Sequence, residues 1–515
     1  MEKELYKWQK ECLNSWKNAG CRGIVDVTTG AGKSYFACAA ILYLQDKFPN
    51  LRVRIVVPTL MLAGQWRNCL IQNTALSVGM RNGQVKNTPD NDATIYVVNS
   101  ARYSISKHIL SDFESDHPVL LIADECHHYS STENSHIFDF IRYMNNSSDK
   151  YYSLGLSATP FSVSNREILS QYLGETVYKY HADDAVTDGI ISPFVIFETA
   201  LSFNKSEWDE YDRISLQLSK LYKLLLQEYP YLKDIPDRSF FATIHQLTAY
   251  EDDEDSIAYK YFTLTLARRK ITLLARSRLL CARELISRLH ADKRILVFCE
   301  RIEQAESIKE ILSQNITKRI SMYHSNMTPD AKRLSLDNFR MHQTNILISC
   351  RALDEGMDVP DADVGIVLSS TSVERQRIQR LGRIIRRSDN KEKAALYYLY
   401  IKESSDDHAY ISEIKCSNVI RMTYNTAENH FINPWYEDLA SSVYKEYSKK
   451  MSDITKKEFI SCIEEGIARH DWMYSPNEIE KKLQSETDNH IRNYYTVMKK
   501  ISIQNLHNKK EQETF

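Results

Sequence analysis

The stretch Val27-Thr28-Thr29-Gly30-Ala31-Gly32-Lys33-Ser34 lies between an apolar run at residues 24–27 and a helix-like segment at residues 35–42. A strand, a glycine-containing turn and the start of a helix are the setting of a phosphate-binding loop. In such a loop backbone N–H groups surround the phosphates, Lys33 reaches the β and γ phosphates, and Ser34 binds Mg²⁺. Val27 stands where the pattern G-x-x-x-x-G-K-[ST] has its first glycine, so an ordinary glycine-containing loop is the alternative. A partner carboxylate at a second strand end would favour the phosphate site.

Two acidic residues supply that partner. The apolar residues 119–123 read as a buried strand, and Asp124 and Glu125 follow directly. An acid at a neighbouring strand end can hold Mg²⁺ through water, and the next acid can orient the water that attacks the γ phosphate. The alternative is that the pair only caps a following helix. With the Lys33 loop in the same chain, we interpret Asp124 as the Mg²⁺ residue and Glu125 as the water-orienting residue.

The composition describes an ordinary globular protein. Its 515 residues correspond to roughly three domains. The net charge of −2 excludes a bulk positive field, so nucleic-acid contacts must come from local patches. The ten cysteines form no C-x-x-C pair, which argues against a zinc site or a disulfide framework. No signal-peptide pattern and no apolar run of about 20 residues is present, so we expect a soluble, cytoplasmic protein.

Two series of β-branched, apolar runs alternate with helix-like segments. This pattern indicates α/β domains with parallel sheets covered on both faces, and ligand sites at the carboxyl ends of the strands. Between the series, residues 204–289 have helical apolar spacing, and after about residue 405 the chain reads as polar and helical. The runs occupy residues 24–27, 54–57, 94–98, 119–123 and 152–156 in the first series, and 294–299, 319–323, 345–349, 364–369 and 396–401 in the second.

Two further motifs follow strands. Ser157-Ala158-Thr159-Pro160 comes after the last run of the first series, and the second series is followed by an arginine-rich segment at residues 379–386. Arg383 and Arg386 are three apart and share one face of a helix, where two guanidinium groups suit a polyphosphate. A solvated basic helix is the alternative.

In this order the motifs resemble the signature blocks of superfamily 2 helicases and translocases, over roughly residues 1–405. That resemblance implies two tandem RecA-like domains, with a helical insert and a helical C-terminal region. We therefore expect motor domain 1 at 1–203, the insert at 204–289, motor domain 2 at 290–404 and an accessory region at 405–515. The blocks are Trp8-Gln9, residues 29–34, Val57-Pro58-Thr59, Asp124-Glu125-Cys126-His127, residues 157–160, Val297-Phe298-Cys299, residues 354–360 and Gln379-x-x-Gly382-Arg383-x-x-Arg386.

Within this superfamily the chain most resembles the branch of the repair and transcription helicase XPB and the motors of type I and III restriction enzymes. Residues 58–66 look like the P-T-x-x-L-x-x-Q-W of that branch, ending in Gln65-Trp66. His127-His128 replaces the Ala-Asp of RNA-remodelling DEAD-box proteins. Residues 185–193 resemble the segment that, in this group, follows the first motor domain and leads into a strand.

The resemblance assigns roles to the matching residues. Gln9 is placed to read adenine, although arginine is often found where this chain has Tyr6. Arg383 and Arg386 act as arginine fingers within a block that begins at Gln379. The remaining assignments are Thr29, Gly30, Ala31, Gly32, Lys33, Ser34, Gly356 and Asp358 at the nucleotide, Ser34 and Asp124 at the metal, His127, Ser157 and Thr159 in coupling, and Thr59, Asn99, Ser100, Arg301, Ser349 and Arg351 on the nucleic acid.

The sequence therefore predicts an ATP- and Mg²⁺-dependent helicase or translocase that steps along DNA, of a kind used in repair, restriction or phage defence. An RNA-dependent ATPase remains open, because the motor blocks do not decide the sugar. A subunit that clamps DNA under ATP control and recruits a nuclease without unwinding is the alternative from another class. The C-terminal region is a candidate docking site for such a partner.

Overall fold

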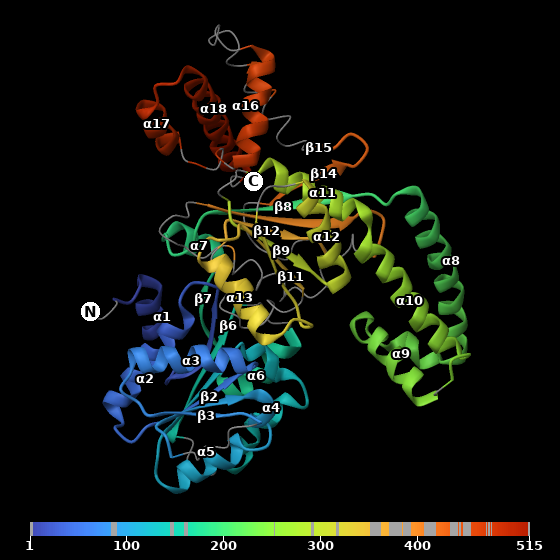
Figure 1. The fold of residues 1–515 in the computed structure, drawn as a ribbon. Coiled ribbons are helices and arrows are strands. Elements are labelled where there is room, and N and C mark those ends of the chain that lie inside the picture. Colours follow the sequence, from blue (N-terminus) through green and yellow to red (C-terminus); the bar gives the residue numbers. More distant parts are fainter. Residues whose placement is uncertain are drawn as a thin grey trace. The chain divides into compact units, whose positions relative to one another are not determined.

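A computed structural model describes residues 4–512 of the protein apart from several internal segments. Those segments are 84–89, 145–148, 159–162, 252, 290–292, 316–318, 351–361, 370–383, 385–392, 406–418, 433–440, 442–443, 446–454, 470, 472–473 and 475. The chain divides into two compact units (Figure 1). The first contains the described residues up to Pro193, and the described residues of the second begin at Phe194.

The first unit is built on a seven-stranded parallel sheet in the order β3-β4-β2-β5-β6-β1-β7. Residues of α5, η1, η2 and α6 form a hydrophobic core against one face of this sheet. The elements are α1 (Lys7–Asn18), β1 (Arg22–Val27), α2 (Lys33–Lys47), β2 (Arg52–Val57), α3 (Leu60–Asn73), β3 (Val78–Arg81), β4 (Ala93–Val97), α4 (Val98–Ala101), α5 (Ile105–Glu114), β5 (Val119–Asp124), the 3₁₀ helices η1 (Cys126–Ser130) and η2 (Asn134–Tyr143), β6 (Tyr151–Ser157), α6 (Val163–Leu173), β7 (Thr176–Tyr180) and α7 (Ala182–Thr187).

All five strands expected in this unit are present, and two more join them. Strands β3 and β7 occupy the two edges of the sheet and are mostly half-buried. An edge strand needs no continuous apolar run, because one side of it lacks a neighbouring strand. The apolar signal therefore identified the inner strands and missed the edges.

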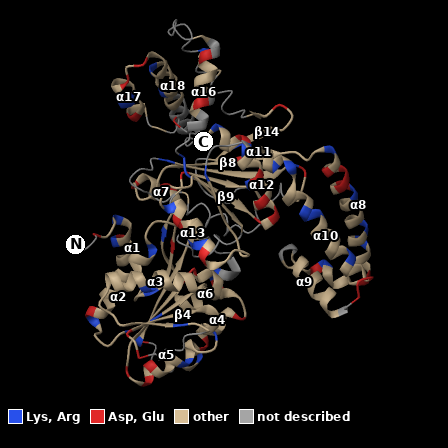
Figure 2. Cartoon of the chain, in the orientation of Figure 1, with Lys and Arg blue, Asp and Glu red and all other residues tan. Residues whose placement is uncertain are grey.

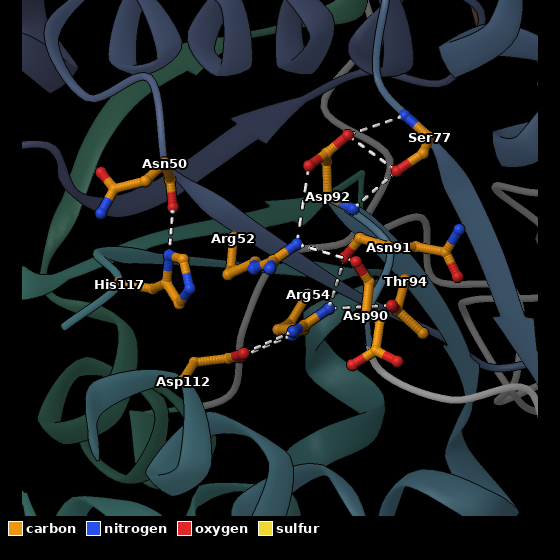
Figure 3. Close-up of polar contacts among 10 residues, drawn as sticks. All are labelled: Asn50, Arg52, Arg54, Ser77, Asp90, Asn91, Asp92, Thr94, Asp112 and His117. Atoms are coloured by element: carbon orange, nitrogen blue, oxygen red, sulfur yellow. Dashed lines mark hydrogen bonds and ion pairs between the residues drawn. The ribbon is translucent and has the colours of Figure 1, made fainter. Parts of the chain in front are cut away.

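One inner strand carries a fully buried charge. Arg54 of β2 is 0% exposed and donates two hydrogen bonds to the carboxylate of Asp112 on α5, at 2.8 and 2.6 Å (Figure 3). The same guanidinium donates to Thr94 Oγ1 at 2.8 Å and to the Asn91 carbonyl at 3.3 Å. Both charged groups thus have partners, as buried ions require.

We expect Arg54→Met to lower the free energy of unfolding by about 3–5 kcal/mol, because it leaves the Asp112 carboxylate buried without its counter-charge. Arg52→Met is the matched control two residues away, since Arg52 pairs with a carboxylate on Asp92 that is 47% exposed (Figure 3). It should cost less than about 1 kcal/mol. Urea unfolding of both variants measures the difference. Equal losses would contradict a special role of the buried pair.

The second unit is built on an eight-stranded sheet in the order β10-β11-β9-β12-β13-β8-β14-β15, parallel except for β15. Most residues of these strands are uncharged, and Glu198 of β8 and Arg421 of β14 are exceptions (Figure 2). The elements are β8 (Phe194–Leu201), α8 (Lys205–Glu228), η4 (Pro230–Asp234), α9 (Asp237–Glu251), α10 (Ile257–Leu274), α11 (Arg276–Arg288), β9 (Ile295–Cys299), α12 (Ile302–Asn315), β10 (Ile320–Tyr323), α13 (Pro329–Arg340), β11 (Ile346–Cys350), β12 (Val364–Val367), β13 (Ala394–Ile401), β14 (Val419–Asn425), β15 (His430–Ile432), α16 (Lys456–Arg469), α17 (Pro476–Ser485) and α18 (Asn489–Gln512).

The expected domain boundaries need two corrections. Residues 194–203 were included in motor domain 1, but residues 194–201 form β8, whose eight residues are all buried between β13 and β14 of the second sheet. The boundary therefore lies at Pro193 rather than at residue 203. The region after residue 405 was expected to be helical, yet β14 and β15 extend the same sheet. Strand β14 alternates between buried and more exposed residues, which is a weaker sequence signal than a continuous apolar run.

The expected helical insert is present but shorter than 204–289. Helices α8, α9 and α10 share a small core of their own around Leu225, Leu232 and Ile244. Helix α11 instead contributes Cys281 and Ile286 to the hydrophobic core of the second sheet. In the described part of the chain, no helix is long and apolar enough to cross a membrane.

Candidate nucleotide and metal site

The loop after β1 has the backbone that its glycines allow. Gly30 and Gly32 have φ values of 82° and 93°, in the left-handed region that side chains with a Cβ rarely adopt. Gly32 is the N-cap of α2, so Lys33 begins the helix. Lys33 Nζ donates to the carbonyl of Val27 at 3.0 Å, which places the ammonium over the loop at the end of β1. A helix N-terminus beside an ammonium group is a suitable site for an anion.

Gln9 of α1 is hydrogen-bonded to this loop. Its side chain is 0% exposed, its Oε1 accepts from the N–H of Tyr6 at 2.9 Å, and its Nε2 donates to the carbonyl of Gly32 at 3.1 Å. A Cβ added at Gly32 would lie 3.2 Å from Gln9 Nε2, so the two residues are closely packed. Gln9 therefore has a structural task at the loop, and its reading of adenine stays a prediction.

Asp124 ends β5, and only β6 separates that strand from β1. Its Oδ2 accepts from Trp66 Nε1 at 2.7 Å, and its Oδ1 accepts from the N–H of Glu125 at 3.1 Å. Burial raises the pKa of the Asp124 carboxyl above its ordinary value, while the Trp66 hydrogen bond and the positive charge of Lys33 oppose that rise. Because β5, β6 and β1 are parallel neighbours, the loop after β1 and Asp124 at the end of β5 lie at the same edge of the sheet.

Glu125 has a strained backbone, with φ at 47°, which is uncommon for a residue with a side chain. The 3₁₀ helix η1 follows it at once, and the Tyr129 hydroxyl of that helix donates to the Asp124 carbonyl at 2.9 Å. His127 Nδ1 lies 3.5 Å from Glu125 Oε2 and 3.0 Å from Ser157 Oγ at the end of β6. The predicted coupling residues His127 and Ser157 thus contact each other, and His127 also lies beside the predicted catalytic Glu125.

The expected nucleic-acid residues lie where strands of their own sheets end. Thr59 caps α3 after β2, its Oγ1 accepting from the Leu62 N–H at 3.3 Å. Asn99 and Ser100 lie in α4 after β4, and Asn99 accepts from Arg102 at 3.1 Å. In the second unit Arg301 is exposed after β9, and Ser349 is buried near the end of β11. These positions are compatible with the predicted contacts and do not test them.

Seven expected site residues lie outside the described residues. They are Thr159, Arg351, Gly356, Asp358, Gln379, Arg383 and Arg386. Of the loop residues that the structure does describe, Thr29 has a buried Oγ1 with no hydrogen-bond partner. Its hydroxyl is therefore available to a ligand.

Trp66 is a buried residue of the site whose role does not follow from the sequence. The Gln65-Trp66 pair ends the stretch that resembles the motif of the XPB and restriction-enzyme branch. The structure places the indole N–H on the carboxylate that was predicted to hold Mg²⁺. The motif at residues 58–66 was a signal that this helix belongs to the site, but it did not specify the contact.

Two family models match the chain. Residues 2–162 match the model described as type III restriction enzyme, res subunit, and residues 277–388 match the helicase conserved C-terminal domain. The DNA 3'-5' translocase XPB2 of Sulfurisphaera tokodaii is 26% identical over 404 residues, which are 78% of this chain and 83% of that protein. The two matched segments cover parts of both sheets, in the order expected for tandem motor domains.

Two solved structures share the fold. The Hef helicase domain of Pyrococcus furiosus is 16% identical, with a TM-score of 0.51 over 78% of this chain and 96% of that one. The type ISP restriction-modification enzyme LlaBIII, solved bound to DNA, is 13% identical, with a TM-score of 0.52 over 97% of this chain and 40% of that one. Together with the family models, these likenesses identify the two sheets as tandem RecA-like domains. The chain belongs to the superfamily 2 helicases and translocases, in the branch of XPB-like and restriction-enzyme motors, and is an ATP-hydrolysing enzyme of that class.

Proposed function

We propose that this protein is an ATP-driven DNA translocase or helicase whose ATP site is built on the carboxyl edge of the first sheet. The observation that carries the proposal is the arrangement of Lys33, Asp124, Glu125, His127 and Ser157 at the ends of three adjacent strands. Motors of this superfamily complete such a site with residues of the second domain, and Arg383 and Arg386 are the candidates here.

The side chains fit the magnesium salt of ATP. Ser34 and Asp124 would hold Mg²⁺, a cation that prefers hydroxyl, carboxylate and water oxygens. When bound, Mg²⁺ neutralises charge on the β and γ phosphates. Lys33 would bind the same phosphates once its hydrogen bond to Val27 is exchanged for a phosphate oxygen. Glu125 would accept the proton of the attacking water, and His127 would hold the Glu125 carboxylate in place from its position beside Ser157.

Each cycle of ATP hydrolysis would move the protein along nucleic acid if the two domains close and open while they bind it. Thr59, Asn99 and Ser100 in the first unit, with Arg301, Ser349 and Arg351 in the second, are the proposed backbone contacts. The same proposal places Gly356, Asp358 and Gln379 near the nucleotide and Thr159 in coupling. DNA is favoured as the track because the XPB2 relative is named a DNA translocase and the LlaBIII structure holds DNA. We further propose that the protein acts inside the cell.

A panel of polynucleotides tests this proposal. ATPase rates are measured with duplex DNA, single-stranded DNA and RNA of matched length, together with displacement of a triplex-forming strand. We expect DNA to stimulate hydrolysis and the triplex strand to be displaced only with ATP. Stimulation by RNA alone would overturn the DNA assignment. Stimulation by DNA without displacement would indicate a clamp that recruits a partner such as a nuclease.

A further inference from the structure

Trp66 is a buried residue held by a well-defined helix. It lies in α3, whose first turn is capped by Thr59, and only 1% of its surface is exposed. Its Nε1 lies 2.7 Å from Asp124 Oδ2. The indole N–H is a donor only, so it can bind the carboxylate but cannot remove a proton from it or accept one. A donor of this kind can orient the carboxylate but takes no part in proton transfer.

The Asp124 carboxylate is fixed at both oxygens. Trp66 holds Oδ2 from α3, while the N–H of Glu125 holds Oδ1 at 3.1 Å from the carboxylate's own chain segment. The second of these bonds is local, because it joins adjacent residues. The Trp66 bond joins residues 58 positions apart in the sequence, so it sets the rotation of the carboxylate relative to the rest of the domain. A carboxylate offers about four lone-pair sites, and two hydrogen bonds leave the others for a metal or its water.

We propose that Trp66 is a positioning residue for the metal site, orienting the Asp124 carboxylate toward the Mg²⁺ that accompanies ATP. This inference rests on the proposed function, because it takes Asp124 as the metal residue. Partners that orient a ligand from behind commonly contribute 10- to 100-fold to metal affinity. Loss of the indole N–H should therefore weaken Mg²⁺ binding while leaving the phosphate loop and its backbone donors intact.

The test compares two buried tryptophans of the same domain. Trp16 of α1 is 0% exposed and donates from Nε1 to the Ser153 carbonyl at 2.9 Å, near the start of β6. Trp66→Phe and Trp16→Phe each remove one buried indole hydrogen bond, but only the first removes it from Asp124. The full-length variants are titrated with a fluorescent ADP in EDTA and in Mg²⁺, and their ATPase rates are measured against Mg²⁺ concentration.

For Trp66→Phe we expect the Mg²⁺ concentration at half-maximal ATPase rate to rise about tenfold. The gain in ADP affinity on adding Mg²⁺ should shrink by a similar factor, with ADP affinity in EDTA unchanged. Trp16→Phe should keep the wild-type value in each measurement. A wild-type Mg²⁺ dependence in Trp66→Phe would overturn the inference.

The experiment also distinguishes failure of the proposed function from a Trp66→Phe variant that does not fold. If wild-type protein binds ADP without any Mg²⁺-dependent gain, the proposed function fails at this site, and the Trp66 inference fails with it. If Trp66→Phe is unfolded, incorporation of benzothienylalanine at position 66 decides the matter, because sulfur replaces the N–H in a ring of nearly the same shape. A tenfold weaker Mg²⁺ dependence in that folded variant supports the inference, and an unchanged one overturns it.

Discussion

Glu125→Gln should lower the kcat of ATP hydrolysis at least about 100-fold, which is the lower range for loss of a general base. Glutamine keeps the size of the side chain but cannot take the proton of the attacking water. Glutamate and glutamine have the same preference for backbone angles, so we expect the turn with φ 47° at position 125 to be retained. ATP affinity should stay within about threefold of wild type, since the Lys33 loop is untouched. Steady-state ATPase with saturating DNA and equilibrium binding of a fluorescent ATP analogue measure the two quantities.

Glu133→Gln provides the matched control for this change. Glu133 lies eight positions further on, and its side chain is 79% exposed where it pairs with Arg102. The same loss of one negative charge at this position should leave kcat unchanged. If Glu125→Gln retained more than a tenth of wild-type kcat, Glu125 could not be the base, and another residue would have to activate the water.

Ending the chain after Glu403 should unfold the second domain rather than remove an accessory part. The deletion takes away β14, which pairs along β8 and contributes the buried side chains of Ile420, Met422 and Tyr424 to the core. Burial of three such side chains is worth roughly 5 kcal/mol or more, comparable to the whole stability of many domains. Residues of α16, α17 and α18 belong to the same hydrophobic core and are lost as well. Thermal unfolding and limited proteolysis should show an unfolded second domain and lost DNA-stimulated ATPase.

A pair of point variants in the full-length chain separates this effect from loss of a docking site. Met422→Asp places a charge at a position that is 5% exposed in β14, whereas Ala427→Asp places the same charge on the exposed turn after it. The first should lower the melting temperature strongly and the second should not. A truncated chain that melted like the full-length protein and kept its ATPase activity would show that the C-terminal region is dispensable for the motor fold.

The inner strands and the phosphate loop were predictable because their signals are local. Strands β1, β2, β4, β5 and β6 are rich in apolar, β-branched residues, and the left-handed backbone at Gly30 and Gly32 favours residues without a Cβ. The order of the motifs also identified the family, which the family models confirm. Strands β3 and β7 escaped prediction because edge positions do not require continuous burial.

The sequence by itself determined which segments form the central strands, where the phosphate loop lies, and which carboxylates follow the neighbouring strand. The tertiary structure decided which strands are neighbours and which side chains meet. Strand β8 pairs within the second sheet, Arg54 forms an ion pair with Asp112, and the Trp66 indole donates a hydrogen bond to Asp124. Each of these contacts joins residues far apart in the chain, and no local pattern encodes the partner. A hydrogen bond depends on the positions of both the donor and the acceptor atom. When the two residues are far apart in the chain, only the packing of helices and strands around a common sheet brings the partner atom into place.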